Sequence, residues 1–567
     1  MTPTETQTEV ATTRSDDGES RPPQRGRLKR SWSAGVTYAR ENPMLVTFIV
    51  AGLIARIVFW AVTDRKLDDA LITIKFDKNL ADGVGFVHNL GDGHVHGFTS
   101  ALSVLVPLPG ELIYHGGGLL LIRLVSLGCF VLAAIYANRI AGELNVGRWP
   151  LAFALAYLAL DQNQVFFGVA GMETQIAVAV LFGAIYYVLV EDYTKSGIAL
   201  GVAVLARPDF VLLVVPAYLF LIARDPRRSV RAAALTAAVL VPWIVFTTIY
   251  YGSPIPNTIA AKSLAFAPDF PAVTQIGAWV DLLRHQVTLN QGSWTLFAPF
   301  FEAAFIVKSP LAYGVAKAIA VLVALLAVVG AAATFRRWSW LPAIAYLALF
   351  VTYKVVYVTV GYFEWYGTPA AALLIFMAAV GLDRVAKWTA SATRNRFTPA
   401  EIVVVPAVLL AFVYAMALPY RTAVEEQVQR NIENKVRKPL GEYLGEVTKP
   451  GDTLTSESSG YVGYDTNATL YDYPGLESTT VVDVLRKAEE SGHPVLPVVG
   501  NVHLLHPDWV VLRPNEARLF VQWYPEDARQ YTAVRRFSVP GGQEPICVQG
   551  FCQRNIDRDF IVFHRKS

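Results

Sequence analysis

Charged residues are scarce in this chain of 567 residues. Asp, Glu, Lys and Arg make up 17% of it, whereas a soluble protein carries about a quarter. Hydrophobic residues reach 53%, and apolar runs of about 20 residues, enough to cross a bilayer core of about 30 Å, recur along the chain. The shortage of charge excludes a soluble globular protein and predicts a polytopic membrane protein.

Cysteine is nearly absent, with three residues in the whole chain. Cys129 lies inside an apolar run, where it is read as a small apolar residue. Cys547 and Cys552 flank the sequence Val-Gln-Gly-Phe, and no His or further Cys stands beside them. This favours a disulfide formed in an oxidising compartment over a metal site.

The chain also lacks a Walker loop and a glycine-rich dinucleotide fingerprint. We therefore expect no nucleotide-binding site, and we expect no nucleic acid partner. No small-residue cleavage site follows the first apolar run, so a signal peptide is not predicted either. An enzyme that faces outward would need an activated donor that the lipid already carries.

Basic residues indicate how the chain threads the membrane. The tail, residues 1–41, is rich in Thr, Ser, Pro and Arg and is predicted to be disordered. Its basic run at 25–30 predicts a cytoplasmic N-terminus by the positive-inside rule. The same rule places three further basic loops inside, at residues 224–231, 336–337 and 384–396. Spans are then expected near residues 45–62, 118–141, 149–160, 232–250, 311–335, 338–359, 366–383 and 401–419.

The run at 99–114 does not fit this path directly. Both Asp68 and Asp161 are expected outside, which requires an even number of crossings between them. Because the run contains two prolines and a glycine, we interpret it as re-entrant or juxtamembrane. The alternative is that a neighbouring run does not cross. Together the runs predict a mostly α domain of about 9–11 transmembrane helices over residues 42–419.

The character of the chain changes after Pro419. A polar helical stretch comes first, and from Asp452 onward short strand-like runs alternate with Gly, Pro, Asn and Asp. Examples of these runs are Trp509-Val-Val-Leu512 and Phe560-Ile-Val-Phe563. This pattern predicts an extracytoplasmic α/β domain over residues 420–567.

Two adjacent carboxylates, Asp68 and Asp69, open the first outer loop, residues 63–98. In hydrocarbon a carboxylate costs roughly 2.5–3.5 kcal/mol, so the pair is expected at the water-facing edge. The apolar spacing that follows predicts a short amphipathic helix lying in the interface. One acid of such a pair holds its proton more tightly than the other. The pair is therefore suited to accept a proton from an acceptor hydroxyl, with Asp69 slightly favoured as the base. A helix cap beside a solvated acid is the structural alternative.

Further polar residues stand at span ends on the same predicted face. They are Glu173, Arg207, Asp209, Asn257, Lys262, Glu364 and Tyr366. The two cations suit a lipid phosphate, and the carboxylates and aromatics suit a sugar. Singly, each has a structural explanation, such as an ion pair, a snorkelling lysine or an aromatic belt. His88, His94 and His96 match no metal signature and are read as solvated loop residues.

Several motifs resemble those of bacterial GT-C glycosyltransferases. The first-loop signature is matched by Asp68-Asp-Ala-Leu-Ile72, by residues 79–89 and by Gly97-Phe-Thr-Ser100. Gly171-Met-Glu-Thr174, Ala206-Arg-Pro-Asp209 and the residues from Pro256 to Lys262 follow in similar order. The likeness covers roughly residues 45–370 and, more weakly, continues through Gly460-Tyr-Val-Gly-Tyr464 and Tyr473-Pro-Gly-Leu476. It is strongest to actinobacterial arabinofuranosyltransferases, although this chain has Gly93-His-Val-His96-Gly97 where many relatives carry an acidic residue before the Gly.

This resemblance implies a glycosyltransferase of the plasma membrane. A sugar, with arabinofuranose favoured, would pass from a decaprenyl-phosphoryl donor to a cell-envelope polysaccharide or glycolipid acceptor. Asp68 and Asp69 would be catalytic and Lys262 and Arg207 would bind the donor phosphate. The other polar residues named above, together with Asn89 and His96, would bind substrate.

No cofactor is required for this chemistry, and a divalent metal ion on the carboxylates is left open. Two other classes of protein are possible alternatives on sequence grounds. A lipid or glycolipid transporter would predict inverted repeats and charges at the midplane. A membrane-anchored glycan-binding protein would predict ligand binding by residues 420–567 alone.

Overall fold

The computed structural model describes residues 37–266, 310–356, 364–394, 396, 398–491, 498–539 and 557–566. The chain forms two units, Met1–Thr47 and Phe48–Ser567, and the arrangement described below is that of the second. The predictions for the tail up to residue 36 and for a disulfide between Cys547 and Cys552 lie outside the described residues.

Among the described residues, five helices are long and apolar enough to cross a membrane. They are α2 (Pro43–Thr63), α6 (Gly117–Glu143), α12 (Pro226–Tyr251), α19 (Glu364–Ala392) and α20 (Pro399–Gln427). Further apolar helices are α7 (Arg148–Leu160), α9 (Thr174–Leu189), α10 (Tyr193–Ala206), α11 (Val211–Arg224), α16 (Pro310–Thr334) and α17 (Leu341–Val356). Each predicted span falls on one of these helices, as expected for a membrane protein.

Short helical pieces connect the long ones. They are α4 (Leu102–Leu105), α5 (Leu108–Ile113), α8 (Gln162–Phe167), η1 (Pro208–Phe210), α13 (Asn257–Phe266) and η3 (Trp338–Trp340). The run at 99–114 thus contains two helices of 4 and 6 residues. At about 1.5 Å per residue neither can cross a bilayer core of about 30 Å.

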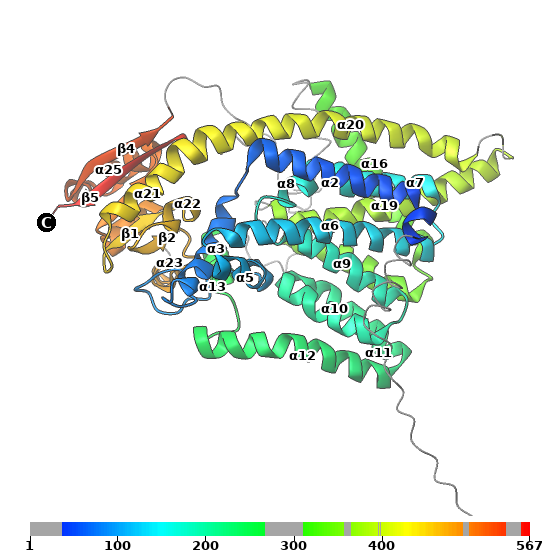
Figure 1. Ribbon diagram of the computed structural model, residues 1–567, viewed down its shortest axis with the longest axis horizontal. Helices are drawn as coiled ribbons and strands as arrows, with labels where there is room; N and C mark the ends of the chain where they lie inside the picture. The colour runs from blue at the N-terminus through cyan, green and yellow to red at the C-terminus, as the bar shows by residue number, and fades with distance from the viewer. Residues whose placement is uncertain are drawn as a thin grey trace, which may run out of the picture. The chain divides into compact units, whose positions relative to one another are not determined.

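The helix α20 continues past the predicted domain boundary at residues 419–420 without a break. It passes through a π-helical segment, η4 (Val428–Arg437), into α21 (Lys438–Val447) (Figure 1). Buried ion pairs fasten this long helix to the first loop. Arg65 pairs with Glu425 at 2.8 Å and with Glu433 at 3.0 Å.

The C-terminal domain, residues 438–566, contains a five-stranded sheet in the order β2-β1-β3-β5-β4. Its strands are β1 (Thr453–Ser456), β2 (Thr469–Asp472), β3 (Trp509–Leu512), β4 (Tyr531–Ser538) and β5 (Asp559–Arg565). Strand β1 pairs in parallel with β2 and β3, and β5 pairs antiparallel with β3 and β4. The helices are α21, α22 (Gly460–Tyr464), α23 (Thr479–Glu490), α24 (Val498–Leu505), α25 (Pro514–Trp523) and α26 (Pro525–Arg529). Both strand-like runs named from the sequence lie in strands, β3 and β5.

The paired carboxylates open α3 (Asp68–Ala81), so the predicted helix is present. Its place at the membrane interface stays a prediction, but its polar residues Lys75, Asp77 and Asn79 are buried as well as its apolar ones. The reason is that α22 of the C-terminal domain packs against α3 (Figure 1). The Lys75 ammonium donates to the backbone oxygens of Gly463 and Thr466.

Candidate active site

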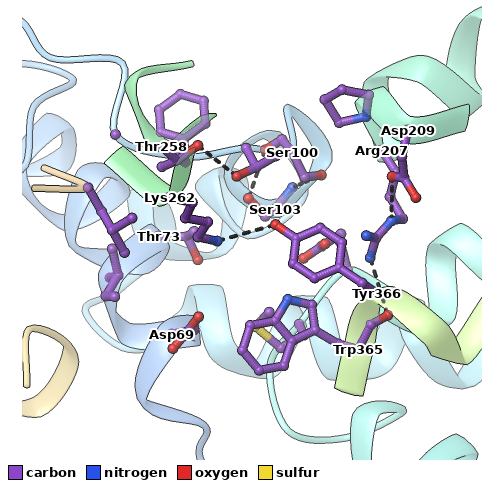
Figure 2. A pocket seen from close by; sticks show the side chains of 18 of the residues that line it. Asp69, Thr73, Ser100, Ser103, Arg207, Asp209, Thr258, Lys262, Trp365 and Tyr366 are labelled. Atoms are coloured by element: carbon purple, nitrogen blue, oxygen red, sulfur yellow. Dashed lines mark hydrogen bonds and ion pairs between the residues drawn. The ribbon is translucent and has the colours of Figure 1, made fainter. Parts of the chain in front are cut away.

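A first cavity lies where α3, the loop at 97–103, α13 and the start of α19 meet. Six residues predicted from the sequence line it: Asp69, Glu173, Arg207, Asp209, Lys262 and Tyr366. Figure 2 shows Asp69 and Lys262 on one side, Arg207 and Asp209 on the other, and Tyr366 between them. Residues that are up to about 300 positions apart in sequence therefore meet in one place.

Tyr366 connects the two cations of this cavity. The Lys262 ammonium donates to the Tyr366 hydroxyl at 3.2 Å, and the Arg207 guanidinium lies 4.3 Å from the centre of the Tyr366 ring. Burial works to lower the pKa of Lys262, but Tyr366 and Asp69 outweigh it, so the pKa is raised and the amine stays charged. The cavity thus keeps two positive charges away from bulk water.

Arg207 leaves one donor group unused. Its Nε donates to Asp209 at 2.9 Å and its Nη1 to the Trp365 carbonyl at 3.2 Å. Its Nη2 is buried and has no hydrogen-bond partner among the described residues. A buried donor without an acceptor is costly, and a phosphate oxygen in the cavity would provide that acceptor.

Asp69 faces the same cavity with a perturbed carboxyl group. Burial raises its pKa to about 6, Lys262 opposes this rise, and the neighbouring Asp68 adds to it. A carboxyl group that titrates near neutral pH is matched to proton transfer at physiological pH.

Asp68 does not line the first cavity, although it is adjacent to Asp69. Its carboxylate accepts hydrogen bonds from the backbone N–H groups of Tyr461 at 2.8 Å and Gly460 at 3.3 Å. It also pairs with Arg437 at 3.6 Å. A Cβ atom on Gly460 would lie 2.1 Å from the Asp68 carbonyl oxygen, so this approach requires glycine. The two acids predicted as one catalytic pair therefore have different surroundings.

Asp68, Asp69 and Lys262 also line a second cavity between α3 and the C-terminal domain. It is the larger of the two, with a volume of about 410 Å³ against about 60 Å³ for the first. The C-terminal domain and η4 provide the other charged and aromatic walls: Arg437, Glu457, Tyr473, Arg513, Glu516 and Asp557. Five carboxylates and three cations line this cavity, and four carboxylates and two cations line the first, so the two cavities differ in volume and not in their excess of acids.

Asn89 and Asn257, which were predicted to bind substrate, line neither cavity. Asn89 donates to the backbone oxygens of Leu470 at 3.0 Å and Glu477 at 3.2 Å. Asn257 donates to those of Gly475 at 2.8 Å and Leu476 at 3.2 Å. Both amides hold the C-terminal domain against the walls of the first cavity.

The prediction of solvated histidines is correct for His94 and wrong for His88 and His96, which are 2% and 4% exposed. The His96 ring stacks on Tyr251 at 5.1 Å, and burial lowers its pKa to about 4. His96, predicted to bind substrate, lines neither cavity. Helix α12 and the C-terminal domain cover this loop. The sequence of the loop alone does not show that it is covered.

Two remaining predictions concern Glu364 and a metal ion. Glu364 begins α19, but its side chain lies outside the part of the chain that the structure describes. Within that part, no three His, Cys, Asp or Glu side chains are grouped so as to hold a metal ion.

Sequence reasoning missed the residues that the C-terminal domain and η4 contribute to the cavities. Glu477 lines the first cavity, and Arg437 and Arg513 line the second. The motif Tyr473-Pro-Gly-Leu476, noted for its resemblance, ends one residue before Glu477 and could have directed attention to it. Arg437 and Arg513 have no comparable signal in the sequence.

The chain has a fold of the GT-C type. The solved oligosaccharyltransferase of Archaeoglobus fulgidus, tethered with an acceptor peptide, matches with a TM-score of 0.50 at 13% identity. The match covers 89% of this chain and 74% of that one. ArnT from Cupriavidus metallidurans, bound to undecaprenyl phosphate, gives 0.47 at 14% identity over 92% of this chain and 98% of that one.

Among curated proteins, the chain is similar to a terminal beta-(1->2)-arabinofuranosyltransferase of Mycobacterium tuberculosis. The two are 27% identical over 233 residues, which cover 36% of this chain and 36% of the relative. The chain thus matches about a third of the length of that relative. Residues 423–559 match a family described as a domain of unknown function, DUF8728.

Proposed function

We propose that this protein is a membrane glycosyltransferase whose substrates meet at Asp69. It takes a sugar, with arabinofuranose favoured, from a polyprenyl-phosphate donor and transfers it to a cell-envelope glycan on the outer face of the membrane. The observation that carries the proposal is that Asp69 and Lys262 line both cavities. One cavity suits a phosphate, and the other has room for a polar acceptor.

The donor phosphate occupies the cationic end of the first cavity. Lys262 supplies one charge, and the unused Nη2 of Arg207 supplies a hydrogen-bond donor. The polyprenyl chain remains in the bilayer, and its sugar extends from the phosphate toward Asp69. The resemblance to enzymes that use decaprenyl-phosphoryl arabinose supports this choice of donor.

The acceptor hydroxyl approaches from the second cavity. Asp69, as the carboxylate, removes the hydroxyl proton while the acceptor oxygen attacks the anomeric carbon. The bond between that carbon and the phosphate oxygen breaks, and the electron pair leaves with the phosphate. Lys262 and Arg207 stabilise the negative charge that develops there. The products are the extended glycan and polyprenyl phosphate.

Asp68 acts as a positioning residue in this proposal. Its carboxylate is occupied by two backbone N–H groups and Arg437. It holds α22 against α3 and thereby fixes the direction of the adjacent Asp69.

The proposal is tested by a transfer assay with the purified chain in nanodiscs. Decaprenyl-phosphoryl arabinofuranose with a labelled sugar is the donor, and an arabinose oligosaccharide is the acceptor. We expect a labelled oligosaccharide that is one sugar longer. The variant Lys262→Ala should raise the donor KM or lower kcat/KM by about 10- to 100-fold, because charge-assisted hydrogen bonds contribute about 1.5–3 kcal/mol.

Lys195→Ala is the matched control, since Lys195 is exposed, pairs with Asp192 and contacts the ring of Tyr187, and lines neither cavity. It should leave the donor kinetics unchanged. Transfer by the wild type without any loss in Lys262→Ala would remove Lys262 from the phosphate site. No transfer from any polyprenyl-phosphate sugar tested would contradict the proposed function.

A further inference from the structure

The residue that follows each of the three parallel strands of the C-terminal domain lines the second cavity. Glu457 follows β1, Tyr473 follows β2 and Arg513 follows β3. Because β1 pairs in parallel with both β2 and β3, the carboxyl ends of these strands meet at one edge of the sheet. In open α/β sheets, ligands bind outside the carboxyl ends of the parallel strands. The second cavity therefore lies where a domain of this class binds its ligand.

The strand order also changes direction at this edge. The chain passes from β1 to β2 on one side and then crosses back to β3 on the other, which gives the order β2-β1-β3. The change falls between β1 and β3, and the ligand crevice of such a sheet lies at this point. An ion pair between Arg513 and Glu457 joins the ends of these two strands. Two further carboxylates hold the Arg513 guanidinium, Glu516 at 2.8 Å and Asp557 at 2.6 Å.

Glu457 presents its carboxylate to the cavity. Its side chain is 42% exposed, whereas that of its partner Arg513 is 10% exposed. A carboxylate has two acceptor oxygens with several lone pairs, so it can accept hydrogen bonds from a ligand while it stays paired with the guanidinium. Because the ion pair already fixes the side chain, Glu457 loses little conformational freedom when a ligand binds. It is thus a preorganised acceptor of hydrogen bonds.

The charges of the cavity point to an uncharged ligand. Its two guanidinium groups already have carboxylate partners: Arg513 has the three described above, and Arg437 pairs with Asp68, Glu433 and Asp557. Their charges are balanced within the protein, so they do not require an anionic ligand. Tyr473 is partly exposed at the same edge and adds an aromatic ring to the wall. A carboxylate beside an aromatic ring suits a sugar, whose hydroxyl groups donate hydrogen bonds and whose C–H groups form an apolar face.

We propose that the carboxyl edge of β1, β2 and β3 binds the acceptor, and that Glu457 and Tyr473 hold one uncharged sugar unit of it. The inference rests on the proposed function and adds to it the residues that select the acceptor. The cavity, at about 410 Å³, is within the range of about 300–1,000 Å³ that small-molecule sites occupy. Asp69 lines the same cavity, so a sugar unit held here can direct a hydroxyl group toward the base.

The test measures glycan binding to the full chain in nanodiscs by calorimetric titration, with no donor added. The probes are three oligosaccharides of equal length. One is built of arabinofuranose and is uncharged, one of galacturonic acid and is acidic, and one of glucosamine and is basic. We expect the uncharged oligosaccharide to bind and the two charged ones to bind more weakly. Empty nanodiscs give the background.

Glu457→Gln should raise the Kd of the uncharged oligosaccharide by about 10- to 100-fold, because it removes the charge from a hydrogen-bond acceptor. Tyr473→Ala should also raise this Kd, whereas Tyr473→Phe keeps the ring and should retain most of the binding. Glu490→Gln is the control, at an exposed position of α23 that lines neither cavity. In the transfer assay, Glu457→Gln should raise the acceptor KM and leave the donor KM unchanged.

Several results would overturn the inference. Wild-type transfer combined with an unchanged Kd and acceptor KM in Glu457→Gln would do so and would leave the proposed function intact. An equal rise of the donor and acceptor KM would assign Glu457 only a structural role beside Arg513. Tighter binding of a charged oligosaccharide would reject the uncharged sugar. If Glu457→Gln fails to fold, Tyr473→Ala decides, and a wild-type Kd in that variant would reject the site. Glycan binding that depends on Glu457, without transfer from any donor, would instead contradict the proposed function and leave a glycan-binding site.

Discussion

Asp68 and Asp69 are adjacent in sequence, but their side chains have different surroundings. Asp68 binds two backbone N–H groups of α22, and Asp69 faces both cavities. On a helix, neighbouring residues point about 100° apart, so adjacent acids are seldom equivalent. The assignment of Asp69 as the base rests on this difference between the surroundings of the two acids.

The pH dependence of transfer should follow the ionisation of Asp69. Its pKa is raised to about 6, and only the carboxylate can accept the proton. We therefore expect kcat/KM to be constant above about pH 7 and to fall below pH 6 with unit slope. Lys262 lowers the pKa of Asp69, so Lys262→Ala should move this acidic limb to higher pH. A profile of initial rates from pH 5 to 8 tests both points.

Lys195→Ala again serves as the control for this profile and should not move the limb. If the acidic limb of the kcat/KM profile does not shift in Lys262→Ala, then Lys262 does not influence the pKa of the group that titrates. A profile that is flat down to pH 5 would exclude Asp69 as the base.

At the scale of single residues, those that line the first cavity were easier to predict than the two amides that hold the C-terminal domain. Arg207, Lys262 and Tyr366 were singled out because they stand at span ends on the same predicted face. Asn89 and Asn257 could not be assigned in this way. An amide that binds a carbonyl of a distant segment is indistinguishable in sequence from one that binds a sugar.

At the scale of elements, α3 is a buried connector between the membrane helices and the C-terminal domain. Its helical form was predictable from its apolar spacing, because that pattern is local. Its burial was not predictable, because the hydrogen bond from the Gly460 N–H to the Asp68 carboxylate joins residues 392 positions apart. From the sequence alone, the polar side of α3 is expected to face water. In the structure the C-terminal domain covers it.

The close contact of α3 with α22 predicts a strong effect of Gly460→Ala. The added Cβ would meet the Asp68 carbonyl oxygen at 2.1 Å and its carboxyl at 2.5 Å, so the two helices must separate. Overpacking of this kind costs about 1–3 kcal/mol. We expect a lower midpoint of denaturant unfolding in nanodiscs and at least a tenfold loss of transfer, since Asp69 would be displaced.

Gly128→Ala provides the comparison, because no heavy atom lies within 4 Å of a Cβ at that helical position. This variant should keep both stability and activity. Wild-type behaviour of Gly460→Ala would mean that the α3–α22 contact does not position Asp69.

At the scale of the whole molecule, the C-terminal domain contributes to the walls of both cavities. The sequence predicted the mostly α membrane part and the α/β class of the C-terminal part, because apolar length and strand spacing are visible locally. It could not predict that Leu476 and Glu477 line the first cavity. It also gave no sign that α20 continues through η4 into α21 across the predicted boundary.

Weakening the docking of the C-terminal domain should therefore impair catalysis, even when none of the substituted residues lines either cavity. Combining Asn89→Ala with Asn257→Ala removes four hydrogen bonds to backbone oxygens of that domain. We expect faster hydrogen exchange in β2 and in residues 473–477, together with a lower kcat. Asn515→Ala, at an exposed position of α25, is the control. Unchanged exchange in the double variant would contradict a docking role for the two amides.

The most direct measurement is the single-turnover rate of sugar transfer in Asp69→Asn, with donor already bound and acceptor in excess. The account predicts a rate about 10² to 10⁴ times below wild type, the usual contribution of a general base, while donor binding is retained. Asp68→Asn should lose less, and Asp483→Asn, an exposed acid of α23, should lose nothing. A wild-type rate in Asp69→Asn would contradict the claim that Asp69 is the group that takes the acceptor proton.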